Sequence, residues 1–99
     1  MTTKLSLSEL LERAKTEYIA IHTPTEKQAK KLLSELDKKG YTWYSGRKLT
    51  TETWYEYYKE KTYYDFSLNK KVCHYSLKFY QDEGYTVIEF ADIDFKEEI

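Results

Sequence analysis

Apolar residues recur at helical spacing near the start of the chain, and this pattern predicts a short N-terminal helix. The residues that share one helical face are Leu7, Leu10, Leu11 and Ala14. The run from Ser6 to Glu9 fits a capping box, in which a serine hydroxyl and a glutamate side chain each accept a backbone amide. We therefore expect a helix from about Leu7 to Lys15 that packs through its leucines.

A second, longer amphipathic helix is predicted to start near Thr23. Thr23 caps it, Pro24 takes the first helical position, where no amide donor is needed, and Glu26 reaches back to the cap. Gly40 ends this helix. The apolar stripe consists of Ala29, Leu32, Leu33 and Leu36, and the opposite face carries Lys27, Lys30, Lys31 and Lys38. We expect the helix to pack on a sheet with its basic face outward.

Shorter segments alternate between apolar and polar residues or are rich in β-branched and aromatic residues, which predicts strands. The expected strands cover 18–22, 41–44, 63–68, 72–77 and 86–91. A turn at Asn69-Lys70 joins two of them into a hairpin, with Cys73 on its apolar face and His74 on its polar face. Ser45-Gly46-Arg47-Lys48 is a turn that projects into solvent, and 50–61 is a short helix or an irregular loop.

Together these elements predict an α+β fold. We expect a small, mainly antiparallel sheet of about five strands packed against one long amphipathic helix, with a short N-terminal helix. A length of 99 residues suits a single domain, because a chain of this size supports only one adequate core. Within 1–99 we expect residues 1–16 to hold the short helix, 18–92 the α+β core and 93–99 an acidic tail that frays.

Composition argues against several classes of protein. The 16 Lys and Arg residues are balanced by 17 Asp and Glu, which does not favour general nucleic-acid binding. The apolar runs are far shorter than the ~18 residues that a membrane span requires. One cysteine and no secretion-signal pattern indicate a cytoplasmic protein. Two isolated histidines and Cys73 make no metal-ligand pattern, so we expect neither a metal nor another cofactor.

Aromatic residues are unusually abundant, with 11 Tyr, 4 Phe and 2 Trp, and several lie close to a cationic turn. A base stacked on an aromatic ring gains about 1–3 kcal/mol, and an arginine binds phosphate through two parallel hydrogen bonds. The candidate ligand-binding residues of this region are Trp43, Ser45, Arg47, Lys48, Trp54 and Tyr58. In the alternative interpretation both tryptophans are core residues and the arginine is simply solvated.

The start of the second helix is another candidate. Helix N-termini carry partial positive charge, and the hydroxyls of Thr23 and Thr25 are available as further donors to a bound phosphate. In the alternative interpretation Thr23 and Glu26 satisfy the first amides of the helix internally.

Several segments resemble small accessory proteins encoded by bacteriophages of Gram-positive bacteria. The segments are Ile21–Thr25, Leu33 with Leu36, Gly40–Gly46, Thr62–Tyr64 and Tyr85–Phe90. They span about three-quarters of the chain, and the Leu7 helix lies outside them. The resemblance implies an accessory phage protein made inside the host, of a kind that often counters host defence by binding and not by catalysis. It assigns no functional residue.

The leading hypothesis is a non-enzymatic, phage-type anti-defence protein in the host cytoplasm that sequesters a nucleotide-derived immune signal. The alternative is a protein-binding inhibitor of a host defence effector, of the anti-CRISPR type, which uses exposed tyrosines and tryptophans as its contact surface. A third alternative is a hydrolase or nuclease that uses His74 with Asp65. An exposed sheet edge also favours a homo-oligomer.

Overall fold

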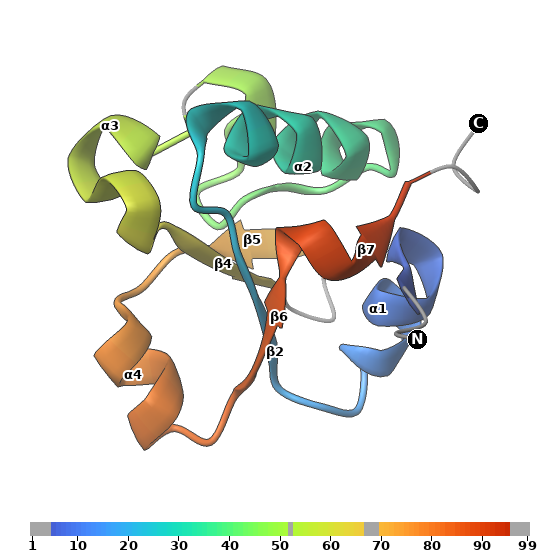
Figure 1. The fold of residues 1–99 in the computed structure, drawn as a ribbon. Coiled ribbons are helices and arrows are strands. Elements are labelled where there is room, and N and C mark those ends of the chain that lie inside the picture. Colours follow the sequence, from blue (N-terminus) through green and yellow to red (C-terminus); the bar gives the residue numbers. More distant parts are fainter. Residues whose placement is uncertain (1–4, 52, 67–69, 96–99) are drawn as a thin grey trace.

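The computed structural model of the chain has an α+β fold and describes residues 5–51, 53–66 and 70–95 (Figure 1). The helices in this part of the chain are α1 (Leu7–Arg13), α2 (Glu26–Lys38), α3 (Tyr55–Tyr58) and α4 (Leu77–Asp82). The strands are β1 (Leu5–Ser6), β2 (Ile19–His22), β3 (Thr42–Trp43), β4 (Tyr63–Phe66), β5 (Lys71–Cys73), β6 (Thr86–Glu89) and β7 (Ile93–Asp94). Short 3-10 turns cover Leu49–Thr51, Lys59–Lys61 and Phe90–Asp92.

The main sheet is mixed, so the prediction of a mainly antiparallel sheet was wrong. Its strand order is β3-β5-β4-β2-β6, in which β4 is antiparallel to both neighbours while β3–β5 and β2–β6 are parallel. The reason is the placement of the helices. The segment with α2 links β2 to β3 and α4 links β5 to β6, and a crossover through a helix returns the chain in the same direction. In the described residues, helical structure is divided among four helices, of which α2 spans 13 residues, so the fold does not rest on a single long helix with a short N-terminal one.

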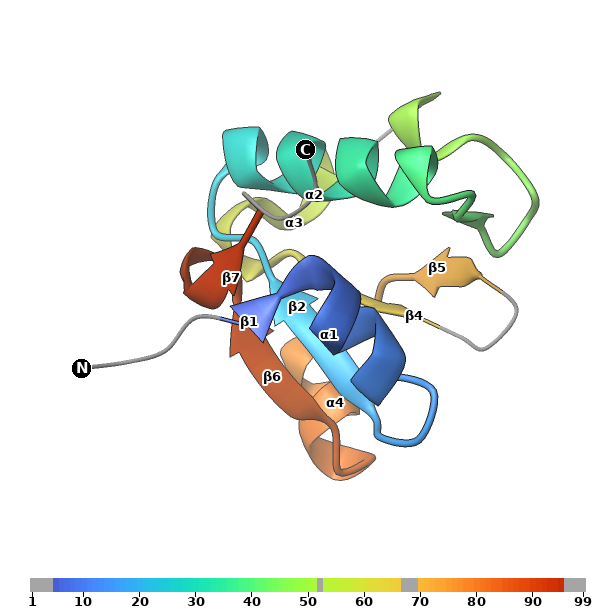
Figure 2. The ribbon, with the colours of Figure 1, turned by 90° about the vertical axis from the view of Figure 1, so that its right-hand side faces the viewer.

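Both faces of the sheet are covered. Ile21 and Tyr64 are cross-strand neighbours on one face and pack against the apolar stripes of α1 and α2. The predicted leucines and Ala29 are buried, whereas Ala14 is only partly buried because α1 ends at Arg13, two residues before the predicted end. Ala20 and Tyr63 lie on the opposite face and pack against Tyr80 of α4. In Figure 2, α1 lies in front of β2 and α4 behind it. The aromatic residues thus form a second, smaller core on the α4 side of the sheet.

The cap of α2 lies two residues later than predicted. Thr25, and not Thr23, is the N-cap: its hydroxyl accepts from the Gln28 amide at 3.2 Å, and the Gln28 side chain accepts from the Thr25 amide at 3.3 Å. Thr23 is fully buried, and its amide and hydroxyl both donate to the Thr62 carbonyl, at 2.9 and 3.3 Å. Pairing with the chain before β4 therefore keeps Thr23 and Pro24 out of the helix.

The two faces of β5 are also reversed relative to the prediction. Val72, expected on the polar face, is fully buried opposite Phe66, whereas Cys73 is half-buried opposite Asp65. The strand ends at Cys73, and α4 starts at Leu77, inside the range expected to be a strand. The predicted turn at Asn69-Lys70 falls partly on 67–69, outside the described residues.

The first residues of the predicted acidic tail, 93–94, are paired, while 96–99 lie outside the described residues. Ile93 and Asp94 form β7, which runs parallel to Leu5 and Ser6 of β1. The Ile93 side chain is only 4% exposed and belongs to the main core. Within the described residues, no helix combines the length and apolarity needed to cross a lipid bilayer.

Candidate functional site

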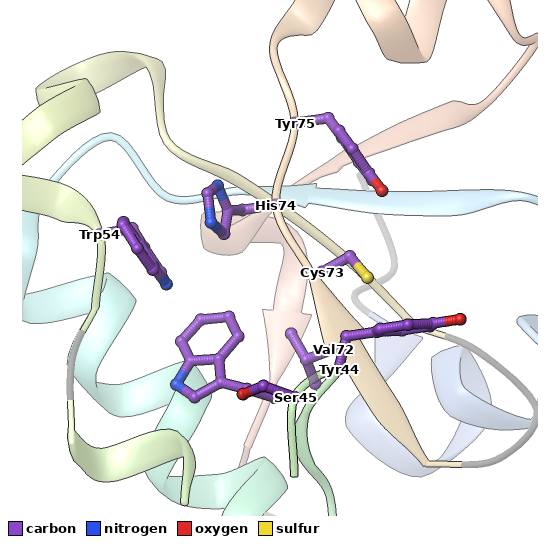
Figure 3. A pocket seen from close by; sticks show the side chains of 8 residues that line it. Tyr44, Ser45, Trp54, Val72, Cys73, His74 and Tyr75 are labelled. Atoms are coloured by element: carbon purple, nitrogen blue, oxygen red, sulfur yellow. The ribbon is translucent and has the colours of Figure 1, made fainter. Parts of the chain in front are cut away.

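A hollow of about 340 Å³ lies where β3 ends beside β5, and it is lined mainly by aromatic side chains (Figure 3). We call it the aromatic hollow. Its lining residues are Trp43, Tyr44, Ser45, Trp54, Val72, Cys73, His74 and Tyr75. Three of the residues predicted to bind a ligand, Trp43, Ser45 and Trp54, are thus brought together. Among the described residues that line the hollow, none is acidic.

A tight turn after β3 positions one wall of the aromatic hollow. The Trp43 amide donates to the Arg47 carbonyl at 2.9 Å, and the Gly46 amide donates to the Trp43 carbonyl at 2.8 Å. Gly46 adopts a φ of +94°, which residues with a Cβ rarely tolerate. As predicted, residues 45–48 are exposed. The Ser-Gly pair therefore lets the chain reverse immediately after Trp43 and leaves Tyr44 and Ser45 at the rim.

Trp54 forms the opposite wall and is held in an unusual backbone conformation. Its φ is +63°, a left-handed value that costs a residue with a Cβ roughly 1–2 kcal/mol. Hydrogen bonds on both sides compensate: the Tyr64 hydroxyl donates to the Thr53 carbonyl, and the Tyr55 hydroxyl donates to the Pro24 carbonyl at 2.8 Å. Strain of this kind, stabilised by its surroundings, is common at binding sites.

Sequence reasoning missed several residues of this site, among which His74 makes the most contacts with the aromatic rings. Its ring lies 4.5 Å from the Trp54 ring, 5.4 Å from Tyr58 and 6.1 Å from Trp43, measured between centroids. The imidazole therefore occupies the space between the three aromatic residues that were expected to clamp a base. The reversed alternation of β5 explains the miss, because it turns His74 to the same side as buried Val72.

Trp43 is largely a core residue. Its side chain is 5% exposed, belongs to the main core and lies 5.9 Å from the Tyr64 ring. Its indole Nε1 is nevertheless buried without a hydrogen-bond partner among the described residues. A buried donor of this kind costs free energy unless an acceptor reaches it. Trp43 therefore combines the core role of the alternative interpretation with a polar atom that has no internal partner.

The cationic turn does not line the aromatic hollow. Arg47 and Lys48 are exposed, and the Lys48 ammonium lies 3.7 Å from an Asp37 carboxylate oxygen on α2. Of the two cations, Arg47 is therefore the one that remains available beside the hollow. Tyr58 contacts the His74 ring and does not line the hollow either.

The threonines before α2 lie apart from the aromatic hollow. Thr25 uses its hydroxyl as the cap of α2, and Thr23 is buried against Thr62. The internal contacts expected in the alternative interpretation are present, although Thr25 and Gln28 make the capping box in place of Thr23 and Glu26. Neither threonine belongs to the candidate site.

The His74–Asp65 pair considered for hydrolysis is not assembled. Asp65 lies opposite Cys73 in the sheet register, whereas His74 packs on Trp43 and Trp54. Figure 3 shows the His74 ring and the Cys73 sulfur on opposite sides of the strand. In the part of the chain that the structure describes, no cluster of three or more His, Cys, Asp or Glu residues could hold a metal ion.

Comparison of the chain with protein-family models, curated proteins and solved structures found no match. The functional argument therefore depends on the geometry of the site.

Proposed function

We propose that the aromatic hollow binds a nucleotide-derived small molecule, and that the protein acts by sequestering it without chemical turnover. The observation that carries the proposal is the concentration of rings around one cavity: Trp54, His74, Tyr44 and Tyr75 with the buried Trp43. The biological setting, a phage-encoded antagonist of bacterial immunity in the host cytoplasm, rests on the resemblance to bacteriophage proteins.

Size and chemistry of the aromatic hollow support a nucleobase ligand. A volume of about 340 Å³ is near the lower end for small-molecule sites, which suits one base with part of its sugar. Every nucleobase has a flat face that stacks on tryptophan or tyrosine. Base carbonyl and ring nitrogen atoms are acceptors, which the exposed Ser45 hydroxyl complements.

The charges around the aromatic hollow favour a phosphate on the same ligand. No acidic side chain is found among its described lining residues, so a phosphate meets little repulsion there. Arg47 stands exposed in the turn that follows Ser45. A guanidinium at this place suits a bidentate contact to phosphate oxygens.

The chain contains two tryptophans, and both line the aromatic hollow, so intrinsic fluorescence reports directly on its occupation. Titration with nucleoside monophosphates and cyclic nucleotides is expected to quench this fluorescence and to release heat in calorimetry. Trp54→Ala should weaken binding by about 5- to 150-fold, which corresponds to the loss of one stacked base. Arg47→Ala should lower the affinity for nucleotides but not for nucleosides. Lys61→Ala, a change at an exposed lysine of another segment, is the matched control. Unchanged affinity of the Trp54 variant refutes the proposal.

A second candidate function, inhibition of a host protein by direct binding, is favoured by the exposed tyrosines around the same site. Tyr44 and Tyr57 are 72% and 68% exposed, and Tyr58 and Tyr75 are 40% and 45% exposed. Exposed tyrosines beside a tryptophan are typical of binding hot spots between proteins.

Tyr57 separates the two candidates, because it contacts Trp54 from outside and does not line the aromatic hollow. If the protein inhibits a host effector, Tyr57→Ala abolishes co-purification of a stoichiometric partner and leaves nucleotide affinity unchanged. If the ligand is a nucleotide, the Tyr57 variant retains function and Trp54→Ala does not.

A further inference from the structure

A second hollow, of about 450 Å³, adjoins the aromatic hollow and shares Tyr44 and Cys73 with it. It lies between the segment after α1 and the strands β4 and β5, and Asp65 is among its lining residues. We call it the Asp65 hollow. Its lining also includes the aromatic residues Tyr18 and Tyr85 and the basic residues Lys15 and Lys71.

Asp65 is an unusual residue for the interior of a sheet. Its side chain is 7% exposed, and its Oδ1 atom has no hydrogen-bond partner in the described part of the chain. Burial raises the pKa of its carboxyl group, against smaller opposing effects from the Tyr85 and Tyr80 hydroxyls and nearby backbone amides. Among the described residues, the Oδ1 atom therefore lacks a donor of the kind that usually offsets the burial of a carboxyl oxygen, and the nearby Tyr80 hydroxyl is also without a partner. Donors supplied from the hollow would offset it.

The walls of the Asp65 hollow are partly aromatic, and its lining includes two lysines and one glutamate. Tyr18 stacks on Tyr85 with ring centroids 5.1 Å apart and an interplanar angle of 22°, and 68% of Tyr18 remains exposed. Lys15, Lys71 and Glu17 also line the hollow. The Glu17 carboxylate pairs with Arg13 at 3.0 Å and the Lys15 ammonium with Glu12 at 3.0 Å, whereas the Lys71 ammonium donates to the neutral Thr42 hydroxyl at 3.2 Å. With Glu17 paired to an arginine, the lysines favour an anionic group over a purely cationic ligand. The ligand that fits combines a flat ring, hydrogen-bond donors for Asp65 and an anionic group for the lysines.

We propose that the Asp65 hollow binds a guanine-type base through the Asp65 carboxylate, with the base stacked on Tyr18 and its phosphate directed to the lysines. Guanine presents a ring N–H beside an exocyclic amine, and a carboxylate accepts both donors side by side. Rotation about the side-chain torsion of aspartate, which is a soft torsion, turns the second oxygen toward the hollow. Adenine has a ring acceptor at the equivalent place and is disfavoured. The choice of ligand class rests on the proposed function, whereas the recognising residue, Asp65, does not line the aromatic hollow.

Calorimetric titrations with GMP, IMP and AMP test the assignment. GMP should bind about 5- to 150-fold more tightly than AMP, the discrimination typical of a bidentate base contact. IMP keeps the ring N–H but lacks the amine, so its affinity should fall between the two. Asp65→Asn should abolish the preference for GMP, because an amide offers one donor and one acceptor in place of two acceptors.

Tyr18→Ala provides a second test, at a side chain that is 68% exposed. This change should lower the affinities for GMP, IMP and AMP by a similar factor. Lys78→Ala, on the exposed face of α4, is the control. Equal affinity for GMP and AMP, or a GMP preference that survives Asp65→Asn, overturns the assignment. If the wild type shows no preference for GMP and Trp54→Ala loses all nucleotide binding, the proposed function stands and only the Asp65 site is refuted.

Discussion

Glu35 shows how a single charged residue is accommodated on the buried side of α2. Its side chain is only 6% exposed, and its Oε1 accepts from the Lys31 ammonium at 2.8 Å and from Lys38 at 3.4 Å. The hydrogen bond from Lys31 is the main reason why the pKa of Glu35 is lowered. A carboxyl whose pKa is lowered in the folded state stabilises the fold above its unfolded pKa, and this stabilisation is lost as the pH falls through the folded pKa.

We expect Glu35→Gln to lower the free energy of unfolding by about 1 kcal/mol at pH 7, because both lysines are partly solvated. The difference from the wild type should shrink as the pH is lowered through the acid range. Urea unfolding at a series of pH values measures both effects. Asp82→Asn, which removes an exposed pair with Lys78 on α4, is the control and should change stability by less than about 0.5 kcal/mol.

Asp65 has the opposite pH dependence. Because burial raises its pKa, the folded state binds the proton more tightly, so the unfolding free energy decreases as the pH rises through the folded pKa. Asp65→Asn should remove this decrease and stabilise the ligand-free protein by about 1 kcal/mol at neutral pH. A variant less stable than the wild type at neutral pH would mean that the carboxylate has compensating partners. The residue proposed to recognise guanine thus reduces stability in the free state.

At the scale of elements, α2 shows that two overlapping caps compete in one sequence. Thr23 with Glu26 and Thr25 with Gln28 both match the capping-box spacing, and only the second is formed. Thr25→Ala should cost about 1 kcal/mol and increase hydrogen exchange at the first amides of α2. Thr23→Val keeps the shape of the side chain, and its effect should appear at the contact with Thr62, with the first turn of α2 unchanged. Equal exchange in the two variants would contradict the cap assignment.

Local patterns predicted the elements whose determinants are local. The apolar stripe of α2 and the solvent-exposed 45–48 turn follow from spacing and turn chemistry, and of the two alternatives for 50–61 the structure has a short helix, α3. The alternation of β5 does not follow from local patterns. Val72, Cys73 and His74 all suit either face of a strand, and the neighbouring strands decide which face is buried. The parallel pairs also depend on contacts between distant segments.

The candidate site was predictable to the same extent. The sequence places Trp43 and Ser45 beside a turn, and the structure brings Trp54 to them as expected. His74 reaches the tryptophans only because β5 pairs with β3, which no local pattern shows. From the sequence, Asp65 is considered only as a partner of His74, because α4 and its tyrosine cluster, which cover that face of the sheet, are separated from it in sequence.

At the scale of the whole molecule, the two ends of the described chain hold each other. Leu5 lies opposite Ile93 and Ser6 opposite Asp94, beside the start of α1 (Figure 2). Ile93 contributes to the same core as the α1 leucines, so β7 helps to hold α1 against the main sheet. This arrangement matters for the Asp65 hollow, because the segment from Ala14 to Tyr18, which directly follows α1, forms one of its walls.

We therefore expect Ile93→Ala to cost about 2–5 kcal/mol, as for other buried aliphatic residues. Leu77→Ala is the matched control: its side chain is 37% exposed, and the change should cost much less. If α1 loosens in the Ile93 variant, the affinity for a ligand bound at Tyr18 should fall more than the affinity for a ligand bound at Trp54. The heat of GMP titration reports on both sites and the tryptophan fluorescence on the aromatic hollow, so the two measurements compare these affinities. If Ile93→Ala unfolds at the same urea concentration as the wild type, the β1–β7 pair contributes nothing to stability, and the acidic end behaves as the frayed tail that its composition suggests.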